Sequence, residues 1–235
     1  MFVIDLYCGL GGWTEGFLAE GFTVYGFDIE RHQYGDAKYP AQLIIQDVLT
    51  IHGRQFKDAT AIVASPPCTE PSYRAMPWKR AKALNAIGPP HKFIELFNAC
   101  FRIQREACEA AGRHIPLIVE NVRGAQPWVG RAAWNFGSYY LWGDVPALMP
   151  ITRRARKFNP DGTVGSWFAI ADSKNTGVKI PGFRFDGSGK SFQGEAVKQS
   201  MGGSKSPKRK AASAAIAKIP FPLARHIAQC CKAAN

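Results

Sequence analysis

The sequence lacks several features that would define its class. It has no apolar run of about 18 residues, the length that a membrane-spanning helix needs. No basic segment followed by an apolar one opens the chain, as a secretory signal would. The six cysteines form no C-x-x-C pair, and no histidine lies at zinc-ligand spacing. We therefore expect a cytoplasmic protein, outside the membrane, with reduced thiols and no metal.

Acidic residues are scarce in the last third of the chain. Residues 1–150 hold 14 basic and 14 acidic side chains, whereas residues 151–235 hold 16 and 4. The net charge of +12 therefore comes from the C-terminal third. Clustered positive charge indicates a polyanionic partner, and a solvated basic surface or disordered tail around 205–210 is the alternative interpretation.

The stretch 65–72, Ser-Pro-Pro-Cys-Thr-Glu-Pro-Ser, organises the rest of the sequence. It follows the apolar run 61–64, which predicts a buried strand, and its prolines end that strand and stiffen the turn that carries Cys68. Ligands and reacting groups collect at the carboxyl edge of an open α/β sheet. A small buried thiol is the alternative for a lone cysteine.

Two further stretches also follow predicted strands. The glycine-rich segment 5–13 overlaps the end of the apolar strand predicted from residue 2. The segment 120–122, Glu-Asn-Val, comes directly after the apolar run 115–119. Because carboxyl ends of parallel strands lie along one sheet edge, a glycine loop, a thiol and a carboxyl group would gather there. This combination indicates an active site.

The spacing after the first strand is typical of a nucleoside-binding βαβ unit. A helix from about residue 14 and a strand over 23–27 are expected, and Asp28 then lies 16 residues after Gly12. An acidic residue roughly 20 positions after such a loop accepts the hydroxyl groups of a ribose. No G-K-[ST] follows the glycines, so the pattern supports an adenosyl cofactor without phosphates.

The remaining pattern predicts an α/β fold with a doubly wound, mostly parallel sheet. Apolar residues at helical spacing favour a long helix over 91–111, with Gly112 as its C-cap. Further strands are expected at 43–45 and 138–142.

The domain organisation is expected to have three parts. A catalytic and cofactor-binding domain covers 1–158, and a small, loop-rich, basic insertion for target recognition covers 159–212. A proline-started helix near 219–228, within a closing segment 213–235, is predicted to pack back on the catalytic domain.

A D-L-x-x-G-x-G-G loop, then P-P-C, then E-N-V at these spacings resembles the S-adenosylmethionine-dependent cytosine-C5 DNA methyltransferases. The resemblance covers about the first two thirds of the chain and implies a Rossmann-like methyltransferase fold. It implies that the Cys68 thiolate adds to C6 of a cytosine flipped out of the duplex, so that C5 can accept a methyl group. Glu120 would hydrogen-bond or protonate N3 of that base.

The resemblance also implies roles for other residues. Arg154 and Arg156 match the arginines of the family's Q-x-R-x-R segment, which orient the catalytic groups, although Thr152 replaces the glutamine. Asp47 would lie beside the adenine, and capping of the next turn is an equally supported interpretation. The cofactor-binding set is Tyr7, Gly9, Leu10, Gly11, Gly12, Trp13, Asp28, Ile29, Asp47, Val48 and Pro67.

Nucleic-acid contacts are expected from two basic segments. Basic and aromatic residues alternate after Cys68, as suits a loop that closes over a nucleic-acid strand. The expected partner is double-stranded DNA, bound by a monomer in the cytoplasm of a prokaryotic cell or a phage-infected host, within a restriction-modification or phage setting. The candidate residues are Ser72, Arg74, Lys79, Arg80, Lys205, Lys208, Arg209 and Lys210.

Several alternatives remain open at the level of sequence. Thr69 replaces the family's glutamine after the thiol, and Lys218 follows the place of its usual Gly-Asn pair. An exocyclic-amine DNA methyltransferase would carry an aromatic residue at Cys68. A tRNA cytosine-C5 methyltransferase, a methyltransferase of free pyrimidine nucleotides and a non-enzymatic nucleic-acid-binding protein are further alternatives.

Overall fold

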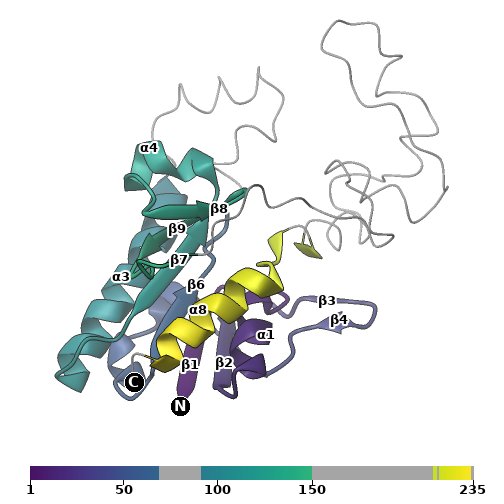
Figure 1. Cartoon of the computed structure of the whole chain (residues 1–235), viewed down its shortest axis with the longest axis horizontal. Helices are drawn as coiled ribbons and strands as arrows, with labels where there is room; N and C mark the ends of the chain where they lie inside the picture. Colours follow the sequence, from purple (N-terminus) through teal and green to yellow (C-terminus); the bar gives the residue numbers. More distant parts are fainter. Residues whose placement is uncertain (69–90, 150–213, 216, 234–235) are drawn as a thin grey trace, which may run out of the picture. The chain divides into compact units, whose positions relative to one another are not determined.

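A computed structural model describes most of the first two thirds of the chain and its C-terminal helix (Figure 1). The described residues are 1–68, 91–149, 214–215 and 217–233. The predicted insertion over 159–212 lies outside them.

The chain divides into two compact units. The first contains all seven strands of the main sheet, and the structure is described below for this unit. The first unit comprises Met1–His32, Lys38–Ala155 and Lys218–Asn235, and the second comprises Gln33–Ala37 and Arg156–Ala217.

The main sheet has the strand order β5-β2-β1-β6-β7-β9-β8. The first five of these strands run parallel, whereas β9 is antiparallel to both β7 and β8. The predicted doubly wound, mostly parallel sheet is therefore confirmed. Its strands are β1 (Phe2–Leu6), β2 (Thr23–Asp28), β5 (Gln42–Ile45), β6 (Ala61–Ala64), β7 (Leu117–Asn121), β8 (Trp134–Phe136) and β9 (Tyr139–Gly143).

The order of the sheet places a topological switch between β1 and β6. The chain adds β2 and β5 on one side of β1, and then returns to add β6 and β7 on the other. In open α/β sheets, ligands bind in the crevice at the carboxyl ends of the two strands where the order reverses. Residues that follow Leu6 and Ala64 are thus placed at the carboxyl edge of the sheet, beside this switch point.

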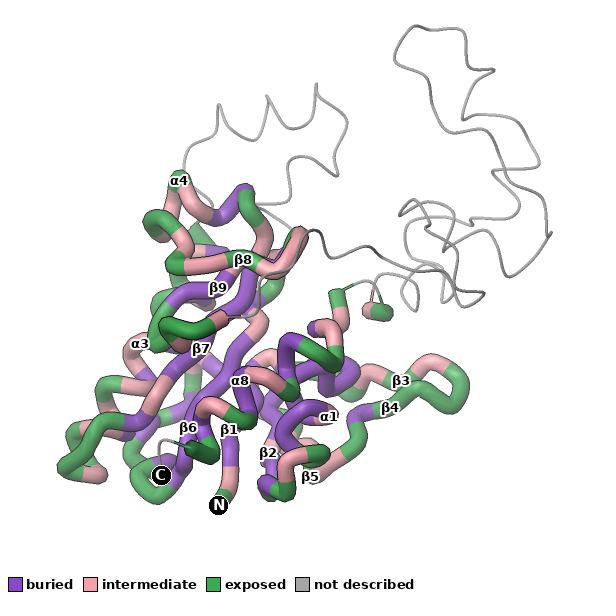
Figure 2. The backbone as a smooth tube through the Cα atoms, viewed as in Figure 1, coloured by how far each residue is buried: buried purple, intermediate pink, exposed green. Residues whose placement is uncertain are grey.

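The two faces of the sheet belong to two apolar clusters. Alternate residues of a strand point to opposite faces, and so Val3 and Ile118 join one cluster while Ile4 and Leu117 join the other. The inner strands are buried on both faces, as the continuous buried tube in the middle of Figure 2 shows. We name the two apolar clusters the α3 cluster and the α8 cluster, after the helix that each contains.

Helix α3 (His91–Ala111) has the predicted bounds. Its buried residues, among them Phe93, Phe97 and Ile103, recur at helical spacing and form one side of the α3 cluster. Gly112 then adopts a left-handed conformation with a φ of 64°, which ends the helix as expected.

Helices α1 (Gly12–Ala19) and α8 (Phe221–Ala233) lie side by side, although about 200 residues separate them (Figure 1). The two helices can approach so closely because two residues of α1 are glycines, which have no Cβ atom. A Cβ atom at Gly12 would collide with the backbone of Ile219, and one at Gly16 would collide with the backbone of Ala224. The C-terminal helix therefore packs directly against the helix that follows the glycine loop.

Polar contacts add to this helix pair. The carboxylate of Glu20 accepts hydrogen bonds from Arg225 Nε at 2.7 Å and from Gln229 Nε2 at 3.0 Å. The hydrogen bond from Arg225 is the main reason why the pKa of Glu20 lies below its ordinary value.

Some element bounds were predicted wrongly. β7 begins at Leu117 and ends at Asn121, so Glu120 lies inside the strand and not after it. Helix α1 already starts at Gly12, because the turn that precedes it is made by Gly9 and Gly11. Short elements were not predicted: β3 (Gln33–Tyr34), β4 (Ala37–Lys38), η1 (Val48–Thr50), η2 (Gly53–Phe56), η4 (Arg123–Ala125), α4 (Gln126–Val129) and β8.

Among the described helices, none combines the length and the apolar character that crossing a membrane would take. The same part of the chain contains no group of three or more potential metal-ligating side chains.

The α1–α8 contact leads to a stability prediction. Replacing Gly16 with Ala places a methyl group against the backbone of Ala224, and such overpacking costs about 1–3 kcal/mol. Chemical unfolding in urea should show a lower midpoint for Gly16→Ala. Leu18→Ala, on an exposed position of the same helix, is the control and should change stability less. Equal midpoints for Gly16→Ala and the unmodified protein would show that the helices can separate at no cost.

Candidate active site

The loop over residues 7–11, between β1 and α1, makes a sharp turn at the carboxyl end of β1. Tyr7 has a φ of 56°, which is unusual for a residue with a side chain. Its hydroxyl group donates a hydrogen bond to the carbonyl oxygen of Leu96 in α3 at 2.9 Å. The Gly11 N–H donates to Cys8 O at 2.7 Å and closes the turn. The loop is thus fixed to the α3 side of the fold.

Asp28, the last residue of β2, holds this loop from the neighbouring strand. Its Oδ2 accepts a hydrogen bond from the Gly9 N–H at 2.9 Å, and its Oδ1 accepts one from the Ile29 N–H at 2.8 Å. Burial alone would raise the pKa of Asp28, but the interaction with His32 and the Gly9 N–H bond outweigh it and lower the pKa. Asp28 is therefore an ionised carboxylate at the predicted ribose position.

Asp5 is a second carboxyl group of the site, and sequence analysis did not assign it a role. It lies within β1 and is only 1% exposed. Its Oδ2 accepts a hydrogen bond from the Thr14 hydroxyl at 2.6 Å, and that hydroxyl lies 2.7 Å from Tyr39 Oη. Its Oδ1 has no partner among the residues that the structure describes. An acidic residue inside an apolar strand was the signal available in the sequence.

The turn that carries Cys68 is held by three other elements. The Ser65 N–H donates to Leu6 O in β1 at 3.1 Å. The Trp13 indole N–H of α1 donates to Ser65 Oγ at 3.1 Å, and the Asn121 side-chain amide of β7 donates to Pro66 O at 2.7 Å. The turn that carries Cys68 is therefore bound both to β1 and α1, which flank the glycine loop, and to β7, the strand of Glu120.

Asn121 thus has a defined partner. Its side-chain amide nitrogen holds the thiol turn through Pro66 O. Its amide oxygen accepts the Val122 N–H at 2.9 Å, which fixes the orientation of the side chain. Asn121 is buried, so both bonds are shielded from water.

Glu120 lies at the carboxyl end of β7, next to the strand that leads into Cys68. It is only 8% exposed and pairs across the antiparallel ladder with Leu141 of β9. By alternation from Ile118, its side chain lies on the face of the α8 cluster. The structure therefore brings the candidate thiol and the candidate acid to one edge of the sheet.

The other candidate cofactor residues differ in accessibility. Ile29 is 68% exposed just past β2, and Pro67 is exposed beside Cys68. Leu10, Trp13 and Val48 are buried, so their side chains pack in the protein interior.

Asp47 caps the N-terminus of η1, which confirms the capping role that the sequence offered beside a contact with adenine. Its Oδ1 accepts the Leu49 N–H at 3.0 Å at the start of η1. A contact of Asp47 with adenine stays a prediction.

Ten predicted residues lie outside the described part of the chain. These are Arg154, Arg156, Ser72, Arg74, Lys79, Arg80, Lys205, Lys208, Arg209 and Lys210.

Several other cysteines have features of structural thiols. Cys8, Cys100 and Cys231 are buried, and burial is the main reason why the pKa of each thiol is raised, to about 12 for Cys231. A raised pKa disfavours the nucleophilic thiolate. Cys68 differs from them because it is half-buried at the carboxyl edge of the sheet.

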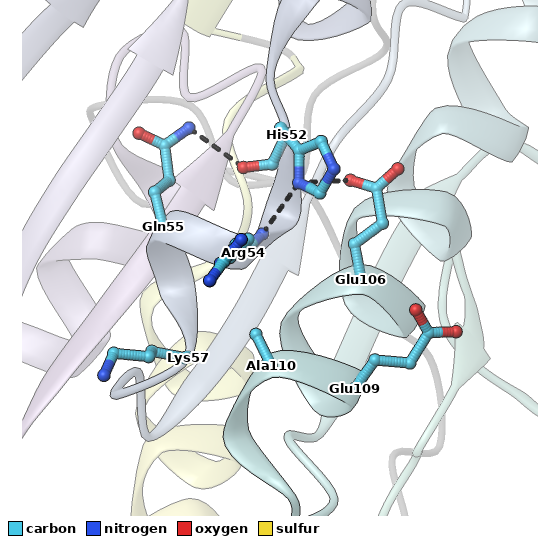
Figure 3. Close-up of a pocket in the computed structure, with 7 residues that line it drawn as sticks. All are labelled: His52, Arg54, Gln55, Lys57, Glu106, Glu109 and Ala110. Atoms are coloured by element: carbon cyan, nitrogen blue, oxygen red, sulfur yellow. Dashed lines mark hydrogen bonds and ion pairs between the residues drawn. The ribbon is translucent and has the colours of Figure 1, made fainter.

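A hollow of about 840 Å³ lies elsewhere, between η2 and the second half of α3 (Figure 3). Both elements lead into the amino ends of strands, so the hollow is at the opposite end of the sheet from Cys68. Its innermost carboxylate, Glu106, accepts hydrogen bonds from the Gly53 N–H at 2.6 Å and from Arg102 Nη1 at 3.0 Å. These bonds fasten η2 to α3, and we assign the hollow a structural role.

The strand order, the antiparallel β9 and the glycine loop after β1 define the class of Rossmann-like methyltransferases. The family model for C-5 cytosine-specific DNA methylases matches residues 1–125, which is more than half of the chain. The chain therefore belongs to the C-5 cytosine-specific DNA methylase family. No curated protein matches it.

Solved structures show a more distant likeness. A prophage-encoded candidate DNA modification methyltransferase of E. coli is 20% identical, with a TM-score of 0.38, over 53% of this chain and 33% of that one. The S. pombe Dnmt2 methyltransferase is 18% identical, with a TM-score of 0.35, over 54% and 36%. The Entamoeba histolytica methyltransferase EhMeth is 16% identical, with a TM-score of 0.35, over 54% and 39%. The matched region thus spans well under half of each of these proteins.

Asp5 leads to a prediction about pH. Burial, more than any other effect, raises the pKa of Asp5 to about 7 from 3.8. The folded state therefore favours the protonated group, whose contribution to stability is complete below about pH 4 and is lost as the pH rises through about 7. Relative to Asp5→Asn, which cannot ionise, the unmodified protein should lose roughly 4 kcal/mol across this range, at about 1.4 kcal/mol per pKa unit. Urea unfolding at several pH values measures this loss, and parallel curves for the two proteins would contradict it.

Proposed function

We propose that the protein is a DNA (cytosine-5)-methyltransferase that uses S-adenosylmethionine and acts on double-stranded DNA. The observation that carries this proposal is the anchoring of residues 65 and 66 to β1, α1 and β7. These bonds hold residues 65 and 66, which precede Cys68, between the glycine loop after β1 and the strand of the buried Glu120. Membership of the C-5 cytosine-specific DNA methylase family supports the same chemistry.

The residues around the loop fit this cofactor. S-adenosylmethionine has a ribose, an adenine and two positively charged groups, and it has no phosphate. Ionised Asp28 suits the ribose hydroxyl groups, and exposed Ile29 suits the flat adenine. When bound, the cofactor supplies a methyl group on a positively charged sulfur. We propose that residues 7–12 hold it together with Asp28, Ile29, Asp47 and Pro67.

The protein's own groups then activate the base. Cytosine C5 is a weak nucleophile, and addition of the Cys68 thiolate to C6 makes it electron-rich enough to attack the methyl group. Glu120 hydrogen-bonds or protonates N3 and stabilises the electron shift during this addition. Loss of the C5 proton and elimination of the thiolate release the methylated base. Because C5 is stacked within a duplex, the cytosine must be flipped out first.

The basic part of the chain fits the polyanionic substrate. Residues 151–235 hold 16 basic and 4 acidic side chains, which suits contacts to phosphate groups. We propose that Arg154 and Arg156 orient the flipped base and the catalytic groups, and that the basic residues near 74–80 and 205–210 contact the backbone of the nucleic acid.

The central prediction concerns Cys68. A duplex containing 5-fluorocytosine should form an adduct with the protein that survives denaturation, because fluorine cannot leave C5 as a proton does. Cys68→Ala should abolish both the adduct and methyl transfer and leave cofactor binding intact. Cys230→Ala, at a partly exposed thiol of α8, is the matched control and should form the adduct normally. Mass spectrometry of the adduct identifies the residue, and labelled methyl transfer to duplex DNA and to tRNA identifies the substrate.

Two outcomes would contradict the proposal. An adduct through another cysteine would show that Cys68 is not the nucleophile. Methyl transfer to tRNA alone would keep the chemistry and replace the substrate.

A second prediction concerns cofactor affinity. Asp28→Ala removes a charged acceptor for the ribose and the partner of the Gly9 N–H, so binding should weaken by about 1.5–3 kcal/mol. Isothermal calorimetry with S-adenosylmethionine gives the value. Glu30→Ala, two residues further and exposed, is the control and should bind almost normally. Full affinity in Asp28→Ala would limit Asp28 to shaping the turn.

A further inference from the structure

Glu120 has an aromatic neighbour on the adjacent strand. β7 and β9 are antiparallel, with Glu120 opposite Leu141, and Tyr139 lies two residues from Leu141 on the same face. Diagonal neighbours in such a ladder are about 7–8 Å apart, which a tyrosine side chain can span. Tyr139 and Glu120 are 6% and 8% exposed. Burial, and after it the charge of Glu120, raises the pKa of Tyr139, in agreement with this proximity.

The Tyr139 hydroxyl group also holds a distant part of the chain. It donates a hydrogen bond to the carbonyl oxygen of Lys218 at 3.2 Å. Lys218 is the first residue of unit 1 after the long segment 156–217 of the second unit. Its Nζ pairs with Glu15 of α1 at 2.5 Å, and the next residue, Ile219, packs against Gly12. The point where the chain re-enters the first unit is therefore held by Tyr139, the diagonal neighbour of Glu120, and by helix α1 after the glycine loop.

We propose that Tyr139 is a positioning residue for Glu120, and that its hydroxyl group sets the distance between Glu120 and the segment Lys218–Ile219. This inference rests on the proposed function, in which Glu120 acts on the base. A buried carboxyl group acts on a base only in a narrow geometry, and a misplacement of about 1 Å can cost about 100-fold in rate. The aromatic ring of Tyr139 packs beside Glu120, while its hydroxyl group keeps the re-entering backbone at a fixed distance from that ring.

The test separates the hydroxyl group from the ring. Tyr139→Phe keeps the ring and removes the bond to Lys218 O. Tyr140→Phe is the matched control, because Tyr140 lies on the other face of the same strand and packs against the α3 cluster. Three quantities are measured on each full-length variant: the affinity for S-adenosylmethionine, the thermal midpoint, and the single-turnover rate of adduct formation with 5-fluorocytosine DNA at saturating cofactor.

We expect Tyr139→Phe to form the adduct at least tenfold more slowly than the unmodified protein, with cofactor affinity within twofold and an unchanged midpoint. Tyr140→Phe should match the unmodified protein. An equal rate in the two variants would overturn the inference, and so would a Tyr139→Phe protein that is unfolded or binds the cofactor poorly, because the hydroxyl group would then serve folding or the loop. If the unmodified protein forms no adduct at all, the proposed function itself fails.

Discussion

The fixing of residues 65 and 66 is the constraint on which the rest of the site depends. A proline-rich turn has few backbone N–H groups of its own, so it cannot hold its shape through local hydrogen bonds. Three outside donors and acceptors replace them: the carbonyl of Leu6, the indole of Trp13 and the amide of Asn121. Each belongs to a different element. The position of the turn that carries Cys68 therefore depends on the packing of β1, α1 and β7 together.

This dependence explains why the C-terminal helix matters to the turn of Cys68. Trp13 can reach Ser65 only if α1 keeps its place. Helix α1 is held from outside by Ile219 at Gly12 and by α8 at Gly16. A single, partly exposed ion pair such as Lys218–Glu15 contributes less than about 1 kcal/mol by itself. The apolar contact of α8 with α1 and the sheet supplies the larger stabilisation, because it removes apolar area from water. Helices α1 and α8, which are far apart in sequence, thus together keep Trp13 within reach of Ser65.

The parts of the fold that sequence predicted are those with local signals. β6 and α3 have the predicted bounds because a short apolar run between turns and a long 3.6-residue period are each strong patterns. Short elements such as β8 and η2 were missed, since three or four residues form too little of a pattern. β7 was shifted by two residues because Pro116 lies inside the apolar run, and polar Glu120 and Asn121 are typical of a loop.

The candidate site was predictable only in part, because local motifs mark single residues while their partners lie far away in the sequence. Motif spacing placed Cys68, Asp28 and Glu120 at or just past strand ends; in the structure Cys68 follows β6, Asp28 ends β2 and Glu120 lies within β7. The roles of Asp5, Trp13 and Asn121 depend on partners 9, 52 and 55 residues away, which no periodicity specifies. Burial distinguishes a Val48 in the core from an Ile29 on the surface, and it is likewise a tertiary property.

The two candidate reacting groups lie on different kinds of structure. Glu120 is part of the ladder with β9, so its backbone is fixed by the pairing of the two strands. Cys68 lies four residues beyond the last residue of β6, in a turn that other elements hold at residues 65 and 66. In the mechanism that we propose, the nucleophile bonds to C6 and leaves it again in each turnover, whereas the acid keeps one position beside N3. A carboxyl group within a strand and a thiol in the turn beyond one match these two tasks.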